Sequence, residues 1–411
     1  MTLLLVFILL VFCHTLVSNR IERANLTAPI IFTGAGILAL LVLPAPELRD
    51  QQANIEVLKK IAEVGLVLLL FTDASRTNLL TLKHIRNLPT RLLSVGMLLT
   101  ILLGALGALL VFPWLSFLEA GILAAILAPT DAGLGQIIVS SPRVPVKIRQ
   151  ALNVEAGLND GLSVPFLLFF IALAGGDAAG ERARLTHFII EQLGYGTLIG
   201  LGIGFLGGWL LKESQDRDWL APSWRQLGVV VLPLLCALVS EECGASMFIA
   251  AFVAGLAVQV RFKEAAQHSV EFTEEWGQLL NLSVFYLFGL LVARAWPQLN
   301  WTHLAYAALS LTVVRMLPVA LALRGTRLSK ATVLFMGWFG PRGLASIVLG
   351  LIYLEHGNHG QGVATITLAV MATVFASILA HGLSASPGME IYARTIRSLP
   401  PDAPELESVE G

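Results

Sequence analysis

Charge is scarce in this sequence. Asp, Glu, Lys and Arg make up 13% of the 411 residues, whereas soluble globular proteins carry about 25%. Hydrophobic residues make up 56%, and the mean hydropathy is +0.76. So little charge cannot cover a water-facing surface, which excludes an ordinary soluble enzyme and an intrinsically disordered chain. The formal net charge of −1 also excludes the basic surface of a nucleic-acid-binding protein.

Cysteines and nucleotide-binding motifs are lacking as well. The three cysteines, Cys13, Cys236 and Cys243, have neither metal-ligand spacing nor the even number of a disulfide framework, so we expect them to be packing residues. The Gly-x-x-x-x-Gly-Lys-Ser/Thr motif is absent, which argues against a nucleotide-driven pump. We therefore expect no cofactor, no nucleotide and no nucleic-acid partner.

What the chain does contain is a series of long apolar segments. A helix that crosses the hydrocarbon core of a bilayer needs about 20 mostly apolar residues. By this criterion the sequence predicts an all-α polytopic membrane protein with about thirteen transmembrane helices. The first segment, residues 2–18, has no positively charged residue before it and no clear cleavage site. We interpret it as a retained helix and not as a signal peptide.

Lysine and arginine set the predicted orientation of these helices. If the N-terminus lies outside, most of the 27 positively charged residues fall in connections that face the cytoplasm. Trp114 and Trp296 lie at predicted span ends, as expected for residues at a membrane–water interface. The sequence therefore predicts a multi-pass protein of the inner membrane with a periplasmic N-terminus and a cytoplasmic C-terminus.

The predicted spans divide into six, a linker helix and six. An odd linker makes the two halves enter the membrane from opposite sides, which is the arrangement of an inverted repeat. We expect a single transmembrane domain over residues 1–384, with repeat one at about 2–173, the linker helix at 186–212 and repeat two at about 225–384. Residues 385–411 are predicted to form a short cytoplasmic tail, disordered at its end.

Two spans in corresponding positions of the repeats carry helix-breaking residues at their centres. The fifth span, 115–140, contains Ala128-Pro129-Thr130-Asp131-Ala132-Gly133, and the twelfth, 330–354, contains Gly340-Pro341-Arg342-Gly343. Paired breaks of this kind, each with a charge, are typical of discontinuous helices that form a binding site near the middle of the membrane. The sequence thus predicts that the fifth and twelfth spans are discontinuous.

Five ionisable residues are expected near the middle of the membrane, where each is costly and is a functional candidate by default. They are Asp131 in the fifth span, Glu155 and Asp160 in the sixth, Arg315 in the eleventh and Arg342 in the twelfth. Four of them are expected close to one plane, with Glu155 about a turn and a half away, and this agreement in depth indicates that they gather at one site.

The sixth span, 147–173, presents its polar groups on two faces. At 100° per residue, Glu155 and Asn159 stack on one face while Asp160 points about 100° away from Asn159. Arg342 is the expected partner of Glu155, because arginine suits bidentate pairing with a carboxylate. This pairing would be structural, and it leaves Asp160 without a counter-ion beside Asp131. An unpaired carboxylate in a partly dry cavity takes up either a proton or a cation.

Two of these charges have alternative interpretations. Asp131 can be a ligand of the ion or only a cap at the helix break. Arg315 is expected to neutralise Asp131 or to cap the carbonyls freed by the break, without a transport role.

The three motifs together resemble the NhaP-like sodium/proton antiporters, the bacterial branch of the cation:proton antiporter family that includes the animal sodium/hydrogen exchangers. The motifs are Thr130-Asp131 in a broken helix, Glu155-x-x-x-Asn159-Asp160 in the next span and Gly340-Pro341-Arg342-Gly343 late in the chain. The resemblance covers essentially the whole chain. It implies a homodimer in which each protomer has a dimerisation region and a six-helix core with two crossed, unwound helices.

The resemblance also implies roles for individual residues. Asp160 would bind the cation or the proton, with Thr130 and Asp131 lining that monovalent-cation site. Glu155 and Arg342 would form a stabilising pair, and Asn159, where electrogenic relatives have a second Asp, would mark electroneutral exchange.

The sequence departs from the family pattern close to this site. Ala132 replaces the Pro that usually follows Thr-Asp, and Ala156 replaces a Ser that can supply an oxygen to the ion. Ser163, one turn after Asp160, is a candidate replacement for that oxygen, and a helix-packing serine is the alternative. Asp73, at the inner end of the third span, is either an acidic group of the site or a charge at the membrane interface.

These residues predict a secondary antiporter that exchanges Na⁺, with Li⁺ or K⁺ left open, for H⁺ by competition at Asp160. A K⁺/H⁺ antiporter of the same fold is the first alternative. An intramembrane aspartyl hydrolase using Asp131 and Asp160 is a different class that lacks support, since no Gly-x-Gly-Asp sequence accompanies the two residues. A cation channel is disfavoured because no repeated filter-like loop is present.

Overall fold

Helices make up nearly all of the structure, a computed structural model that describes residues 2–23, 26–42, 51–76, 87–174, 194–262, 265–356, 361–400 and 402–406. Within these ranges there are helices, turns and short connections but no strand. The predicted all-α fold is confirmed.

Each predicted span coincides with one described helix, a continuous series of helical segments or a pair of half-helices. The elements are α1 (Thr2–Arg23), α2 (Ala28–Val42), α3 (Gln51–Arg76), α5 (Asn87–Arg91), η2 (Leu92–Gly96), α6 (Met97–Val111), α7 (Phe117–Ile126), α8 (Ala132–Val139), α9 (Val146–Ala174), α11 (Gly196–Asp216), α12 (Pro222–Glu242), α13 (Met247–Arg261), α14 (Ala265–Ala295), η4 (Trp296–Gln298), α15 (Trp301–Leu311), α16 (Val313–Ala322), α17 (Lys330–Trp338), α18 (Leu344–His356) and α19 (Gln361–Ile396). The linker helix was predicted at 186–212, of which 186–193 lie outside the described residues.

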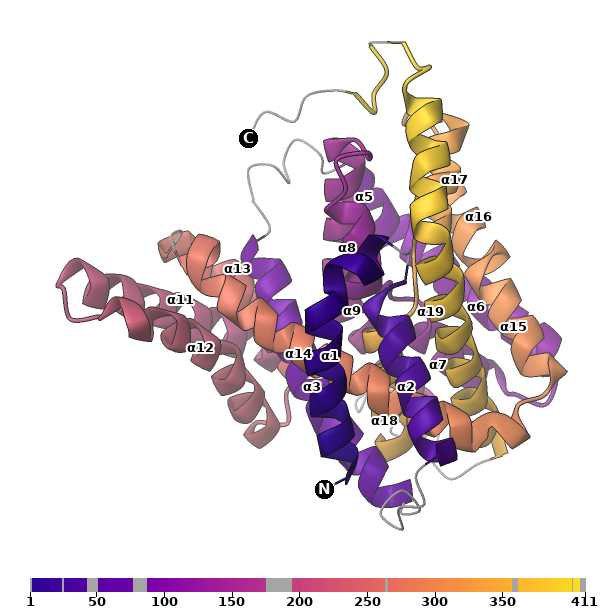
Figure 1. Cartoon of the computed structure of the whole chain (residues 1–411), viewed down its shortest axis with the longest axis horizontal. Coiled ribbons are helices and arrows are strands. Elements are labelled where there is room, and N and C mark those ends of the chain that lie inside the picture. Colours follow the sequence, from indigo (N-terminus) through magenta and orange to yellow (C-terminus); the bar gives the residue numbers. More distant parts are fainter. Residues whose placement is uncertain are drawn as a thin grey trace.

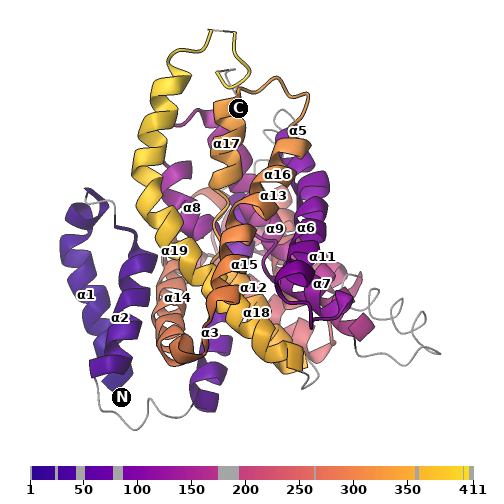
Figure 2. The ribbon, with the colours of Figure 1, turned by 90° about the vertical axis from the view of Figure 1, so that its right-hand side faces the viewer.

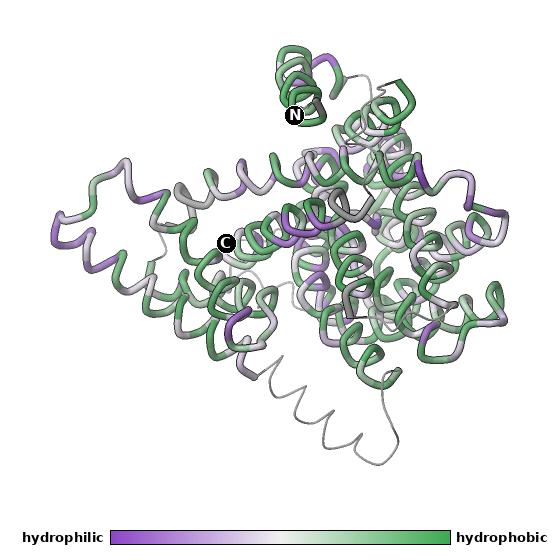
Figure 3. The backbone as a smooth tube through the Cα atoms, turned by 90° about the horizontal axis from the view of Figure 1, so that it is seen from below, coloured by the Kyte–Doolittle hydropathy of each residue, from purple (hydrophilic) through white to green (hydrophobic). Residues whose placement is uncertain are grey.

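The lengths and surfaces of the helices suit a bilayer. Among the described residues, seven helices are long and apolar enough to cross a membrane, and four further apolar helices have 10–17 residues. Large apolar side chains such as Leu41, Leu110 and Leu198 are exposed on the outside of the protein, and apolar residues predominate along the outer helices in Figure 3. Since water would disfavour such a surface, the chain is a multi-pass membrane protein.

The helices pack in two groups, shown in Figures 1 and 2. In the flanking group, α13 packs on α3, α11 and α12, and α14 packs on α2 and α3. In the central group, α6 packs on α7, α15 and α16, while α19 packs on α15, α17 and α18. Helix α9 contacts α7 and α8 of the central group and also α3 of the flanking group. The sixth span therefore lies between the two groups.

The two ends of the described chain lie at opposite ends of the molecule. Helix α1 begins at the lower end of Figure 1 and α19 finishes at the upper end. An odd number of spans requires this arrangement. Which end faces the cytoplasm, and whether the halves are related as inverted repeats, stay predictions.

The C-terminal segment differs from the prediction. Helix α19 continues to Ile396, beyond the predicted end of the last span at 384. Residues 402–406 are described, and Glu405 among them is only 2% exposed. Its Oε1 accepts hydrogen bonds from the Ser329 N–H at 2.6 Å and the Thr332 hydroxyl at 2.9 Å. The described part of the tail is thus attached to the start of α17 through the buried Glu405 carboxylate. The sequence alone does not show that Glu405 meets donors at Ser329 and Thr332. Residues 407–411 lie outside the described part.

Candidate functional site

Both predicted helix breaks are present. Helix α7 ends at Ile126 and α8 begins at Ala132, while α17 ends at Trp338 and α18 begins at Leu344. Pro129 and Pro341 lie inside the two breaks, where their lack of an N–H cannot interrupt a helical ladder. The unwound segments leave backbone groups without helical partners, so the surrounding side chains have to satisfy them.

Asp131 joins the two breaks. Its N–H donates to the Pro341 carbonyl at 2.8 Å, its Oδ1 accepts from the Leu134 N–H at 2.8 Å, and its Oδ2 accepts from the Leu344 N–H. One carboxylate thus caps the N-termini of both α8 and α18, where the helix dipoles favour negative charge. A Cβ atom on Gly343 would overlap this carboxylate, so the approach requires glycine there. Capping is the alternative that the sequence left open for Asp131.

Arg342 caps carbonyl groups and does not form the predicted ion pair. The residue is fully buried, and its Nη1 donates to the Ala128 and Pro129 carbonyls, each at 3.0 Å. These are the carbonyls freed where α7 ends. The predicted pairing of Arg342 with Glu155 was therefore wrong.

Glu155 pairs with Arg315 instead. Arg315 Nη1 lies 2.6 Å from Glu155 Oε1, and both side chains are buried. The expectation that Arg315 neutralises Asp131 or caps carbonyls was also wrong, because the two arginines have exchanged roles. Both lie at similar depth, and only the packing of α16 against the second break decides which one reaches Glu155. A Cβ atom on Gly340 would overlap the Arg315 guanidinium, so this glycine makes room for the pair.

Asn159 of α9 connects the sixth span to the first helix break through hydrogen bonds with Thr130. Its Oδ1 accepts from the Thr130 N–H at 3.1 Å, and its Nδ2 donates to Thr130 Oγ1 at 2.7 Å. Both polar ends of the Asn159 amide are used, which fixes the Thr130 hydroxyl next to α9.

Asp160 takes part in none of these side-chain contacts. It is 8% exposed, and its Oδ1 is buried and has no hydrogen-bond partner. The Ser163 hydroxyl, the suggested source of an additional oxygen, donates to the Asp160 backbone carbonyl at 2.8 Å and so serves its own helix. Within the part of the chain that the structure describes, Asp160 thus has a buried oxygen that no donor satisfies.

The flanking group contributes two polar residues to the site, Asp73 beside the turn before Asp160 and Asn281 beside Asp131. Asp73 of α3 packs on Gly157, one turn before Asp160, with a Cβ on that glycine 3.1 Å from Asp73 Cβ. Asn281 of α14 was not found from the sequence. A Cβ on Gly133 would lie 2.9 Å from Asn281 Nδ2 and 3.0 Å from Asp131 Oδ1, and Asn281 Oδ1 is buried without a partner. A lone Asn in an apolar span is the only signal that could have revealed it.

A small cavity borders the first break on the side of α8. Its volume is about 20 Å³, enough for about one water molecule. The lining includes Thr130, Asp131, Glu155 and Ala156. The cavity therefore lies beside the polar groups of the first break.

Ser377 and His381 of α19, also missed from the sequence, support the second break. Ser377 Oγ accepts from the Arg342 N–H at 2.6 Å, and His381 Nε2 lies 2.8 Å from the Trp338 carbonyl oxygen. No group of three or more potential metal-ligating side chains occurs among the described residues.

Two broken helices that meet beside a buried, unpaired carboxylate define the class of membrane transport proteins with discontinuous helices. The chain belongs to the sodium/hydrogen exchanger transmembrane family, whose family model matches residues 6–390.

Individual relatives agree with this membership. A probable Na⁺/H⁺ antiporter of Schizosaccharomyces pombe is 28% identical over 316 residues, which cover 72% of this chain and 41% of the relative. The K⁺/H⁺ antiporter NhaP2 of Shewanella sp. (strain MR-4) is 24% identical over 355 residues, 86% of this chain and 60% of the relative. The chain thus spans about half the length of the curated relatives it matches.

The fold has a solved counterpart. The sodium proton antiporter MjNhaP1 from Methanocaldococcus jannaschii superimposes with a TM-score of 0.77 at 19% identity, covering 95% of this chain and 98% of that one. At this identity the comparison concerns the fold.

Proposed function

We propose that the protein is a secondary antiporter that exchanges a monovalent cation, Na⁺ in the first instance, for H⁺ at Asp160. The observation that carries the proposal is the buried Asp160 oxygen without a partner, in a site where Asp131, Glu155 and Arg342 are held by other contacts. Among the described acidic side chains, Asp160 is the one whose buried oxygen has no hydrogen-bond partner, so we assign to it the competition between cation and proton.

The mechanism follows from this competition. A proton or a cation can neutralise the Asp160 carboxylate, and the loaded site is cheaper to move through a dry region than the bare anion. We propose that the central group carries the site past the flanking group, so that it opens to each side in turn. Thr130 and Asp131 line the cation site, and Asp73 of α3 adds negative charge from the flanking group. Asn159, Glu155, Arg315 and Arg342 hold the broken helices in shape.

The test is cation-induced pH change in vesicles containing the purified protein. Asp160→Asn removes the titrating group at nearly constant volume and is expected to abolish exchange. Asp218→Asn is the matched control, because Asp218 is exposed and its left-handed φ of 57° suits asparagine. Full activity of Asp160→Asn would refute the proposal.

Competition also predicts a pH dependence. Cation and proton exclude each other at one carboxylate, so the apparent cation affinity should weaken as pH falls, approaching roughly tenfold per pH unit once the site is mainly protonated. The measurement is half-saturation by Na⁺ across pH. An affinity that does not change with pH would mean that the two ions do not share the site.

Electroneutral exchange is a separate part of the proposal. Asn159 supplies an amide where a second carboxylate would add charge, and the amide is occupied by Thr130. With one carboxylate, one cation exchanges for one proton, and no net charge crosses. The rate should therefore not respond to an imposed membrane potential, and a steep response would contradict this stoichiometry.

Exchange of K⁺ is the second candidate. Ala156 lines the small cavity without offering an oxygen, and relatives of comparable similarity are described as K⁺/H⁺ antiporters. Apparent affinities for Na⁺, Li⁺ and K⁺ decide between the ions. Ala156→Ser is expected to improve the affinity for the smaller ions if the missing oxygen matters.

The family resemblance further supports a homodimer in the inner membrane, with the N-terminus periplasmic and the C-terminus cytoplasmic.

A further inference from the structure

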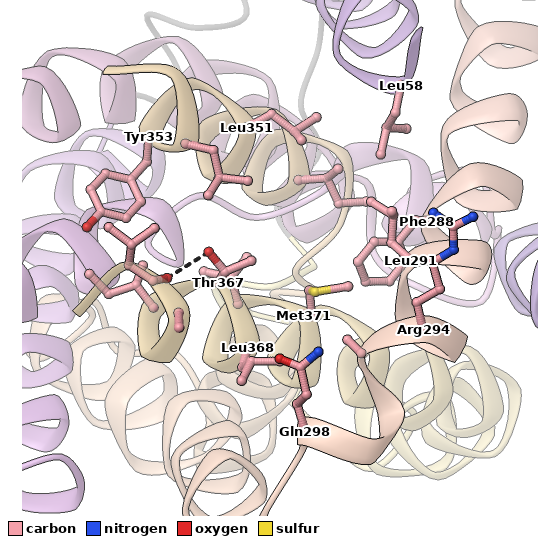
Figure 4. Close-up of a pocket in the computed structure, with 18 residues that line it drawn as sticks. Leu58, Phe288, Leu291, Arg294, Gln298, Leu351, Tyr353, Thr367, Leu368 and Met371 are labelled. Atoms are coloured by element: carbon pink, nitrogen blue, oxygen red, sulfur yellow. Dashed lines mark hydrogen bonds between the residues drawn. The ribbon is translucent and has the colours of Figure 1, made fainter. Parts of the chain in front are cut away.

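A second and much larger cavity lies between the two helix groups, and none of the residues in the two helix breaks lines it. Its volume is about 470 Å³, within the usual range of ligand-binding pockets. It is lined from the flanking group by α3 and α14, and from the central group by α18 and α19. Figure 4 shows the side chains that face it.

Most of this cavity is apolar. Leu58, Phe288, Leu351 and Met371, from four different helices, contribute its hydrophobic walls. The Thr367 hydroxyl faces it as well, but that group already donates to the Val363 carbonyl at 2.8 Å. Such walls suit a hydrocarbon chain.

One end of the cavity is different, because it contains an unsatisfied positive charge. Arg294, in the last turn of α14, lines the cavity together with Gln298 of η4. The Nη1 and Nη2 atoms of Arg294 are buried and have no hydrogen-bond partner. A buried guanidinium without an anion is costly, and its two parallel N–H groups match the oxygens of a phosphate or carboxylate.

The charged end lies at the depth of the membrane interface. Arg294 precedes Trp296 and Trp301 in the sequence by two and seven residues, and both tryptophans are exposed at span ends, where aromatic side chains mark the headgroup region. Phe288 lies on α14 before Arg294 and therefore closer to the middle of the membrane. The cavity thus has an anion-binding end at the headgroups and apolar walls toward the hydrocarbon core.

We propose that this cavity binds an anionic phospholipid, with the phosphate on the Arg294 guanidinium and an acyl chain along Leu58, Phe288 and Leu351. Phospholipid is the amphipathic anion most abundant at this depth, and its charge and its chain match the two ends of the cavity. If the groups move against each other as in the proposed function, one lipid contacts both and its occupancy affects the rate of exchange.

The test is lipid retention by the purified full chain, measured by native mass spectrometry after exposure to phosphatidylglycerol or to phosphatidylcholine. The wild type should retain phosphatidylglycerol in preference. Arg294→Gln removes the charge and should reduce that preference roughly tenfold, the loss of one charge-assisted contact. Arg217→Gln is the matched control, because Arg217 is exposed and pairs with Glu213 on the surface.

A second variant tests the apolar part independently of the charge. Gly350 lines the cavity, and a Cβ there would lie 3.5 Å from Val370 Cγ1, an ordinary contact. Gly350→Leu should fill the space and abolish retention of either lipid, whereas Gly350→Ala should retain it. If Gly350→Leu does not fold, the preference of Arg294→Gln for phosphatidylglycerol over phosphatidylcholine still tests the proposal.

Several outcomes would overturn the proposal. They are no retention by the wild type, equal retention of the two lipids, an unchanged preference in Arg294→Gln, and displacement of the lipid by inorganic phosphate alone. Tighter retention of oleate than of phosphatidylglycerol would identify a fatty acid as the occupant and would also refute the phospholipid. Retention does not require transport, so this result is independent of the Asp160→Asn result.

Discussion

At the scale of single residues, the site shows how a dry interior tolerates charge. Glu155 has a counter-ion, Arg342 has two carbonyls, and the Asp131 carboxylate accepts from two backbone N–H groups. Each of these charges is fixed by partners that would be expensive to lose. Among the carboxylates that the structure describes, Asp160 is the one with a buried oxygen that lacks a donor, which is why we assign the exchange to it.

The Glu155–Arg315 pair makes a direct prediction about stability. Removing one partner leaves an uncompensated buried charge, so Glu155→Gln should lower the free energy of unfolding by about 3–5 kcal/mol. The measurement is a double-mutant cycle from thermal unfolding in detergent, with Arg315→Met as the second change. The same cycle with Arg342→Met is the comparison. A larger coupling of Glu155 to Arg342 than to Arg315 would contradict the pairing.

Gly343 makes a second prediction at this scale. Gly343→Ala places a methyl group on the Asp131 carboxylate and should cost about 1–3 kcal/mol in stability, the usual effect of overpacking. It should also slow exchange by separating the two breaks. Gly135→Ala is the control, since nothing lies within 4 Å of its added Cβ. Equal thermal stability of the two variants would refute this account.

At the scale of helices, proline and glycine predicted the breaks in the fifth and twelfth spans, but the sequence did not predict the break in the eleventh. The eleventh predicted span, which contains Arg315, divides at Thr312 into α15 and α16. The Thr312 hydroxyl donates to the Ala308 carbonyl at 2.6 Å, a local bond that competes with the helical ladder. No proline or glycine marks this position, so composition gives no warning of it.

The start of α17 gives a prediction for the C-terminal segment. Burial alone would raise the pKa of the Glu405 carboxyl, but the hydrogen bonds from the Ser329 N–H and the Thr332 hydroxyl outweigh it and hold that pKa below its ordinary value. A lowered folded pKa stabilises the docked segment above the ordinary glutamate pKa. This stabilisation is lost as pH falls through the folded pKa.

Glu405→Gln should therefore loosen the segment at neutral pH, by about 1 kcal/mol as for other helix caps. Hydrogen exchange of the first turn of α17 measures the effect. Glu390→Gln is the control, because the Glu390 pair with Arg143 is exposed and long at 3.8 Å. Faster exchange in the control than in Glu405→Gln would argue against the contact.

At the scale of the whole molecule, the distribution of positive charge predicts the orientation in the membrane. Pro297 and Ser398 are exposed, and they lie in segments predicted to face the periplasm and the cytoplasm. In a chain without its three native cysteines, a membrane-impermeant maleimide should label Pro297→Cys in intact cells. It should label Ser398→Cys only after permeabilisation. The opposite pattern would reverse the orientation.

Properties that depend on position along the chain could be predicted without the structure. Low charge and long apolar segments give a multi-pass helical protein, proline and glycine at two span centres give the breaks, and the position of a residue within a span gives its depth. That is why Asp131, Asp160, Arg315 and Arg342 were predicted close to one plane, with Glu155 about a turn and a half away.

The contacts that the helices make around that plane could be seen only in the folded protein. The depth of a side chain does not specify which neighbour it meets. For this reason Glu155 was predicted to pair with Arg342, whereas in the structure Glu155 pairs with Arg315. The same reason explains why Asn281, Ser377 and the Arg294 cavity were not foreseen. Each arises from helices far apart in the sequence, and packing alone brings their side chains together.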